Sequence, residues 1–324
     1  MRTAMKVLIA AVLGTALAGP VLADDTKSIA IIVMNDTPQL LEVKEGLLKG
    51  LAKHGYVEGK NLKVDFKSAQ GNFGTAQQIV RQFVGERPDV IVPITTPTSQ
   101  AAAAATKDIP IVFSTVTDPV AAKIVPSNKH PGGNASGVTD VVPIERQLAV
   151  VKQLVPNLKT LGLLYDPSLD NARSTVEQVK KVAPTMGFTT VESGAMGLNN
   201  VPAAAQALVG KADAIFVPND TTVYGAFESV VKVGQDAKVP VFTAERRSVQ
   251  RGAVATVGFD FVQMGLVTAD MVDKVLKGAK PGDLDVVRME DVPDSLGLYI
   301  NKASAEKMGV KVPPELLAKA AHVF

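Results

Sequence analysis

Hydroxyl side chains cluster where one apolar run ends and an alanine-rich run begins. The segment "DVIVPITTPTSQAAAAA" places Thr96, Thr98 and Ser99 around Pro97, a residue that suits the first turn of a helix. Free backbone N–H groups at a helix start, with hydroxyls beside them, can bind an anionic group such as a carboxylate. An ordinary helix cap has the same signature, so this segment alone leaves both interpretations open.

Acidic and hydroxyl residues follow three other apolar runs. "STVTDPV" contains Thr117 and Asp118, and "PNDTTVYG" contains Asp220 and Thr222. "GFD" ends in Asp260. These carboxylates lack an evident acid partner, which favours holding a cation over moving protons. We therefore predict a cleft that holds an α-amino acid, with its carboxylate at the hydroxyl cluster and its ammonium group on these aspartates. An apolar wall for its side chain is expected from Phe113, Tyr165, Tyr224 and Phe259.

No pattern in the sequence is typical of catalysis or metal binding. The three histidines, His54, His130 and His322, are scattered, and the chain has no cysteine. Neither a G-x-S-x-G elbow nor a phosphate-binding G-x-x-x-x-G-K-[ST] loop occurs. We predict no catalytic residue, no metal and no cofactor. The lack of cysteine also excludes disulfides and a lipid-modified N-terminal cysteine.

Strand-like and helix-like runs alternate along the chain, as in an α/β protein with a parallel sheet. "SIAIIVM", "NLKVDFKSA" and "DVIVPI" are separated by amphipathic helical segments, and the same order begins again at Leu158. "PDVIVPITTPTSQAAAA" aligns with "ADAIFVPNDTTVYGAFE". The repeat predicts two similar Rossmann-like lobes. In such sheets ligands bind beyond the carboxyl ends of the strands, where the polar clusters lie.

The first 23 residues have the pattern of an export signal. Two basic residues precede the apolar run "VLIAAVLGTALAGPVLA", and small residues at its end predict cleavage after Ala23. Cleavage leaves equal numbers of basic and acidic residues, and no basic stripe occurs, which argues against nucleic-acid binding. We expect a freely diffusing periplasmic protein.

Several motifs resemble those of one known family. "DIPIVFSTVTDPVAAKIV", "HPGGNASGVTD", "LGLLYDPSLDNA" and "GKADAIFVPNDTTV" are similar to ABC-transporter substrate-binding proteins of the type I periplasmic-binding fold, in the subfamily associated with aromatic amino acid (tryptophan/tyrosine) uptake. The resemblance covers nearly the whole mature chain. It implies hinge closure around a solute and delivery of that solute to a membrane permease, with no chemistry on the ligand. We also expect a monomer. The resemblance also implies ligand contacts from Thr96, Thr98, Ser99, Thr117, Asp118, Asp220, Thr222 and Asp260.

Two segments depart from the family pattern. Asp36-Thr37-Pro38 replaces Glu-His-Pro after the first strand, and Ala244-Glu245-Arg246-Arg247 replaces Ser-Asp-Thr-Asp. An arginine pair at the mouth of the cleft would favour a more acidic ligand. Two other functions stay open, a sensor that presents its closed form to a receptor and, more distantly, a periplasmic α/β enzyme.

The repeat also predicts where the lobes begin and end. Lobe one is expected to comprise residues 27–138 and 259–282, and lobe two residues 139–258 and 283–324. The chain would cross between them near Gly137, Gly258 and Gly282. These crossings would form the hinge of the closing motion.

Overall fold

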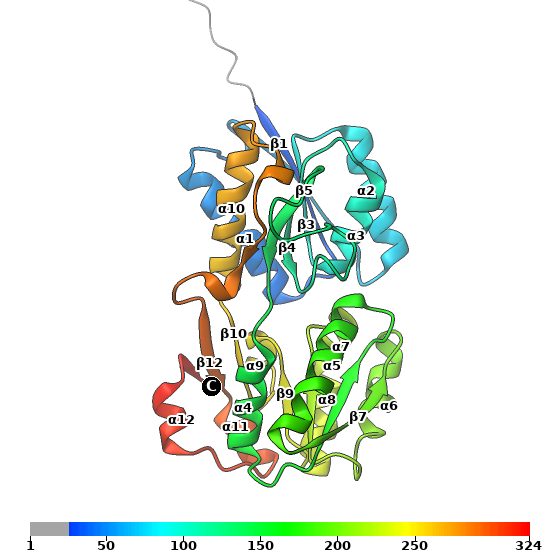
Figure 1. Ribbon diagram of the computed structural model, residues 1–324, viewed down its shortest axis with the longest axis vertical. Helices are drawn as coiled ribbons and strands as arrows, with labels where there is room; N and C mark the ends of the chain where they lie inside the picture. The colour runs from blue at the N-terminus through cyan, green and yellow to red at the C-terminus, as the bar shows by residue number, and fades with distance from the viewer. Residues whose placement is uncertain (1–25) are drawn as a thin grey trace, which may run out of the picture.

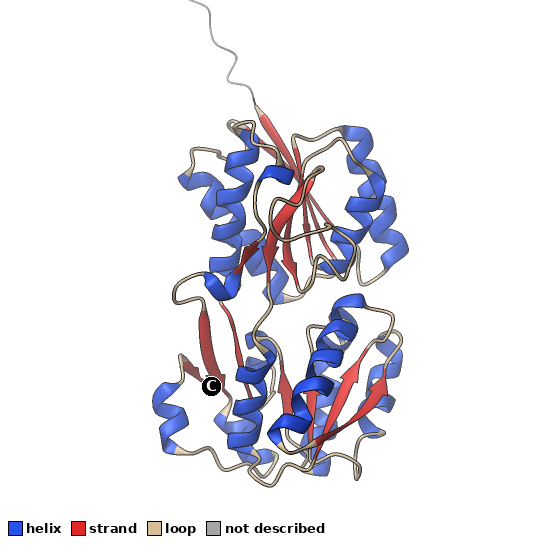
Figure 2. Cartoon of the chain, in the orientation of Figure 1, coloured by secondary structure: helices blue, strands red, loops and turns tan. Residues whose placement is uncertain are grey.

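Two α/β lobes make up residues 26–324, the part of the chain that the computed structural model describes (Figure 1). The predicted signal peptide of residues 1–23 lies outside the described residues. Each lobe has its own sheet, with helices on its faces (Figure 2). The structure therefore confirms the predicted alternation of strands and helices.

The first lobe contains a six-stranded sheet in the order β11-β5-β4-β3-β1-β2, in which every neighbouring pair is parallel. Its strands are β1 (Lys27–Val33), β2 (Leu62–Ser68), β3 (Val90–Ile94), β4 (Ile111–Val116), β5 (Ala135–Thr139) and β11 (Val287–Arg288). Its helices are α1 (Pro38–Lys53), α2 (Phe73–Glu86), α3 (Thr96–Ala105) and α10 (Phe261–Leu276).

Alternation along the strands of this lobe separates two apolar cores. In β1, Ile29 and Ile31 join the core formed with α1 and α10, whereas Ala30 and Ile32 join the core formed with α2 and α3. Successive side chains of a strand point to opposite faces of the sheet. Helices α1 and α10 therefore cover one face, and α2 and α3 cover the other.

Helices α1 and α10 approach each other very closely. A Cβ atom placed on Gly46 would lie 2.1 Å from the carbonyl oxygen of Val262, and one on Gly265 would lie 2.2 Å from that of Val43. Only glycine permits this backbone contact at both positions. The contact holds α10 on the first lobe, although α1 ends at Lys53 and α10 begins only at Phe261.

The second lobe contains a four-stranded parallel sheet in the order β7-β6-β8-β9 and a smaller sheet in the order β10-β12-β13. Strand β10 is antiparallel to β12, which is parallel to β13. The strands are β6 (Thr160–Tyr165), β7 (Thr189–Gly194), β8 (Ala214–Val217), β9 (Val241–Thr243), β10 (Ala255–Phe259), β12 (Leu296–Ile300) and β13 (His322–Val323).

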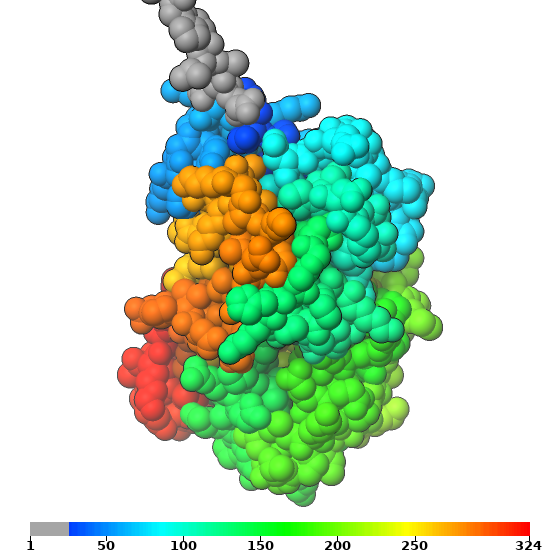
Figure 3. Space-filling view, turned by 45° about the horizontal axis from the view of Figure 1, so that its top comes forward, coloured from blue at the N-terminus to red at the C-terminus, as the bar shows by residue number. Residues whose placement is uncertain are grey.

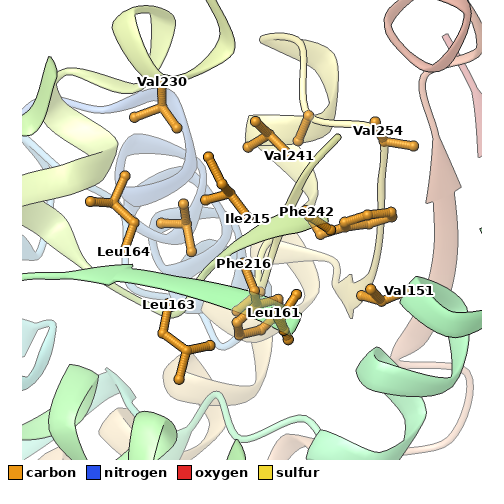
Figure 4. Packing of buried hydrophobic residues seen from close by; sticks show 14 of the residues in the cluster. Val151, Leu161, Leu163, Leu164, Ile215, Phe216, Val230, Val241, Phe242 and Val254 are labelled. Atoms are coloured by element: carbon orange, nitrogen blue, oxygen red, sulfur yellow. The ribbon is translucent and has the colours of Figure 1, made fainter. Parts of the chain in front are cut away.

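The helices of the second lobe surround one apolar core. They are α4 (Ile144–Leu154), α5 (Asp170–Val182), α6 (Val201–Gln206), α7 (Thr221–Gly225), α8 (Phe227–Ala237), α9 (Arg246–Gln250), α11 (Lys302–Lys307) and α12 (Pro314–Lys319). Figure 4 shows the centre of this core, where Leu163 of β6, Ile215 of β8 and Phe242 of β9 are buried.

The chain changes lobes at three places within the described residues: between β5 and α4, between β10 and α10, and between β11 and β12. The last crossing corrects the predicted boundary at residue 282. Strand β11 belongs to the first-lobe sheet, because Val287 pairs with Val138 of β5. A two-residue edge strand has too little periodicity to be recognised in the sequence.

Candidate functional site

A cavity lies between the lobes, at the carboxyl ends of their parallel strands, and residues of both lobes line it. The first lobe and its crossing contribute Asn35, Thr37, Gln39, Leu40, Thr95, Thr96, Thr115, Thr117, Asp140 and Phe261. The second lobe contributes Asn171, Asn219, Asp220, Thr221, Tyr224 and Glu245.

The start of α3, where Thr96 lines this cavity, has free backbone donors. Thr95 has a φ of 101°, an uncommon value for threonine, and the turn that it makes lets α3 begin directly after β3. Among the described residues, no group accepts a hydrogen bond from the backbone N–H of Thr96 or Thr98. Pro97 has no N–H to satisfy. The positive end of the helix dipole and two free N–H groups therefore favour an anion here.

The predicted hydroxyl cluster divides into one cavity residue and two structural residues. Thr96 lines the cavity. The Thr98 hydroxyl donates to the carbonyl oxygen of Ile94 at 2.8 Å, and the Ser99 hydroxyl donates to that of Thr95 at 2.7 Å. Both side chains are fully buried. They stabilise the turn that exposes the N–H groups.

Asp140, which the sequence analysis did not select, joins both lobes at the cavity. The Thr117 hydroxyl donates to its Oδ1 at 2.9 Å, and Asn219 Nδ2 of the second lobe donates to its Oδ2 at 3.0 Å. Burial raises the pKa of Asp140 to about 6, and the hydrogen bonds offset only part of that effect. Its place directly after an apolar strand, in "GVTD", was the signal that could have identified it.

Asp220 lines the cavity and also caps α7. Its Oδ1 accepts from the backbone N–H of Val223 at 2.9 Å, and its Oδ2 accepts from that of Asp166 at 2.5 Å. Burial raises its pKa to about 7 despite these hydrogen bonds. Thr222 donates to Asp166 Oδ2 at 2.9 Å and lies outside the cavity lining.

The structure places Asp118 and Asp260 outside the cavity lining. Asp118 accepts from the backbone N–H of Ala121 at 2.9 Å and from the Ser174 hydroxyl of the other lobe at 3.2 Å. Asp260 caps α10 and lies 3.2 Å from Arg246 Nη1. These two carboxylates therefore serve local structure and contacts between lobes in this arrangement.

The arginine pair also lies outside the cavity lining. Arg246 Nη2 lies 2.9 Å from Glu42 Oε2 of α1, and Arg247 forms an ion pair with the same carboxylate. Glu42 belongs to the first lobe and the arginines belong to the second. The pair thus connects the lobes beside the cavity.

Leu40, Tyr224 and Phe261 form the apolar part of the cavity lining. Of the four aromatic residues expected there, only Tyr224 lines it. Phe113 and Phe259 are buried in the first-lobe cores, and the Tyr165 hydroxyl donates to Glu192 at 2.6 Å. These three side chains belong to the apolar cores of the lobes and not to the cavity lining.

Two side-chain oxygens of the cavity lining are buried without a hydrogen-bond partner. They are Oε1 of Gln39, on α1, and Oδ1 of Asn171, on α5. Glu245 is also buried in the lining, but its carboxylate already accepts from the backbone N–H groups of Arg247 and Ser248. Burial raises the pKa of Glu245. The cavity therefore offers unpaired acceptors as well as unpaired donors.

No group of three or more acidic or histidine side chains that could hold a metal ion occurs in residues 26–324. Over the same residues, no helix has the length and apolar character needed to cross a membrane.

A family model described as "ABC transporter substrate binding protein" matches residues 28–324. The chain belongs to this family. It is 37% identical over 265 residues to the tyrosine-binding protein of Clostridioides difficile, which covers 82% of this chain and 77% of that protein. The architecture is the type I periplasmic-binding fold. Proteins of this family are periplasmic or extracellular.

This structure is similar to two solved structures of relatives, with different TM-scores. A Streptococcus pneumoniae ABC domain in complex with L-Trp is 34% identical, covers 92% of this chain and all of its own, and has a TM-score of 0.88. A ligand-free, open substrate-binding protein from Clostridium difficile, also 34% identical, covers 92% of this chain and 99% of its own, with a TM-score of 0.70. The structure thus superposes better on the L-Trp complex than on the ligand-free, open protein.

Contacts between the lobes agree with a closed arrangement. Asn35 Nδ2 donates to the carbonyl oxygen of Thr221 at 3.2 Å, and Gln100 Nε2 donates to Asp170 Oδ2 at 2.6 Å. Figure 3 shows one face of the molecule, where the surfaces of the two lobes lie against each other. The two lobes are therefore in direct contact in this structure.

Proposed function

We propose that this protein binds one aromatic L-amino acid in the cavity and delivers it unchanged to an ABC permease. The observation that carries this proposal is the pairing of free N–H donors at α3 with buried acceptors on the facing lobe, around one small cavity. An amino acid has the matching anion and cation on one carbon. The tyrosine and tryptophan named for two relatives support the aromatic class.

The ligand carboxylate would bind to the N–H groups of Thr96 and Thr98. Its ammonium group would lie near Asp140 and Asp220, with Asn171 Oδ1 as a further acceptor. Two buried carboxylates with raised pKa values lack a nearby positive charge in the cavity, and an ammonium group would supply it. The ring would pack against Leu40 and Phe261.

Calorimetry on refolded protein, freed of any co-purified ligand, tests this proposal. L-tryptophan, L-tyrosine and L-phenylalanine should be compared with tryptamine, which lacks the carboxylate, and indole-3-propionate, which lacks the ammonium group. We expect binding to require both groups. Equal affinity for tryptamine or indole-3-propionate would contradict the proposed site.

The transport role includes three further proposals: a monomer, a periplasmic location and no chemistry on the ligand. Fractionation of cells that express the full chain should recover a protein cleaved after Ala23 in the periplasm. Mass spectrometry of the released ligand should show an unchanged mass. A chemically altered product would instead support the enzyme alternative.

A further inference from the structure

Gln39 has a buried amide oxygen without a partner at the cavity. The residue lies in the first turn of α1 and is 4% exposed, and no described group donates to its Oε1. Neighbouring polar groups satisfy one another: Thr37 donates to Asn35, and Asn35 donates to Thr221. A buried acceptor left without a donor is unfavourable, so this oxygen points to a ligand group.

The position of Gln39 in the fold separates it from the amino acid head group. It lies on α1 beside Leu40, and α1 packs against α10, which contributes Phe261. The free N–H groups belong to α3, on the opposite face of the sheet. Gln39 therefore lies among the apolar residues, where the ligand side chain would pack.

The other unpartnered oxygen of the lining belongs to the opposite end. Asn171 Nδ2 donates to the carbonyl oxygen of Asn219, whose own side chain donates to Asp140. Asn171 is thus part of the head-group region. Among the described residues of the apolar end, Gln39 is the one with an unpaired buried oxygen.

We propose that Gln39 is a specificity-determining residue that selects aromatic amino acids whose ring carries a hydrogen-bond donor. The indole N–H of tryptophan or the phenol O–H of tyrosine would donate to Oε1. Phenylalanine would bury this oxygen unpaired, and a site built to hydrogen-bond a ligand rejects the analogue that lacks the group. This inference rests on the proposed function.

Calorimetry with the three aromatic amino acids tests the inference in wild-type protein and in Gln39→Met and Gln39→Leu. We expect wild type to bind tryptophan or tyrosine at least tenfold more tightly than phenylalanine. In both variants this ratio should fall by tenfold or more, with the phenylalanine affinity retained. The two variants guard against one failing to fold.

Gln100→Met provides the matched control. It removes a hydrogen bond between the lobes outside the cavity lining, from Gln100 Nε2 to Asp170. It should weaken all three ligands by the same factor and leave the ratio unchanged.

Two results would overturn the inference: a wild type that binds phenylalanine as tightly as the other two, or a ratio that survives in the Gln39 variants. In either case amino acid binding itself would stand. If none of the three ligands binds, the proposed function and this inference fail together.

Discussion

Replacing Glu42 by glutamine should shift the protein towards an open arrangement. Glu42 on α1 is the first-lobe partner of both Arg246 and Arg247, and its side chain is 11% exposed. The arginine side chains are 18% and 32% exposed. Opening the lobes separates these charges, so the ion pairs stabilise only the closed state.

The expected magnitude lies between two limits. Exposed ion pairs contribute about 0.2–1 kcal/mol, and removing one partner of a buried pair costs about 3–5 kcal/mol. Glu42 is nearly buried, but Arg246 keeps Asp260 at 3.2 Å, and Arg247 is partly solvated. We expect a loss of about 1.5–3 kcal/mol, or roughly 10–150-fold in apparent affinity at about 1.4 kcal/mol per decade.

Calorimetry and small-angle scattering should be combined on this variant. The ligand affinity should fall, and the radius of gyration without ligand should be larger than that of wild type. Glu45→Gln is the matched control on the same helix, because Glu45 pairs with Lys49 at 53% and 58% exposure and, within residues 26–324, forms no ion pair with the second lobe. Its affinity should stay within twofold of wild type.

An affinity for Glu42→Gln within twofold of wild type, with an unchanged melting temperature and scattering curve, would refute this reasoning. The ion pairs would then contribute nothing to closure.

Three further predictions concern the site and the packing. The affinity for an amino acid should be constant near pH 8 and should fall as the pH drops through 7 towards 5. Asp140 and Asp220 have pKa values of about 6 and about 7, and each must lose its proton to pair with an ammonium group. An affinity that is independent of pH would exclude both residues from that role. Asp220→Asn keeps an oxygen for the cap of α7 but loses the acceptor for the Asp166 N–H, and it should lose more than tenfold in affinity by calorimetry; an affinity within twofold of wild type would exclude Asp220 from the ammonium site. Gly46→Ala should lower the free energy of unfolding, measured by urea titration, by about 1–3 kcal/mol, because the added methyl group overpacks against α10. Gly85 has open space around it, so Gly85→Ala should raise the free energy of unfolding by up to about 1 kcal/mol in the same measurement.

The sequence by itself determined the order of strands and helices and the places where polar residues follow buried strands. Both are local properties: the apolar period of β3 and the break at Pro97 are present in a few consecutive residues. The repeat of that order was enough to predict two lobes, and the motifs were enough to identify the family. Thr96, Thr117 and Asp220 were selected in this way, and all three line the cavity.

Only the tertiary structure decided which side chains face the ligand cavity. Thr98 and Ser99 follow the same strand as Thr96, but the turn at Thr95 directs their hydroxyls to backbone carbonyls. Gln39 and Asp140 line the cavity because helix packing and lobe closure bring them there from distant parts of the chain. Direction and closure depend on contacts between segments far apart in sequence, which no local pattern of residues specifies.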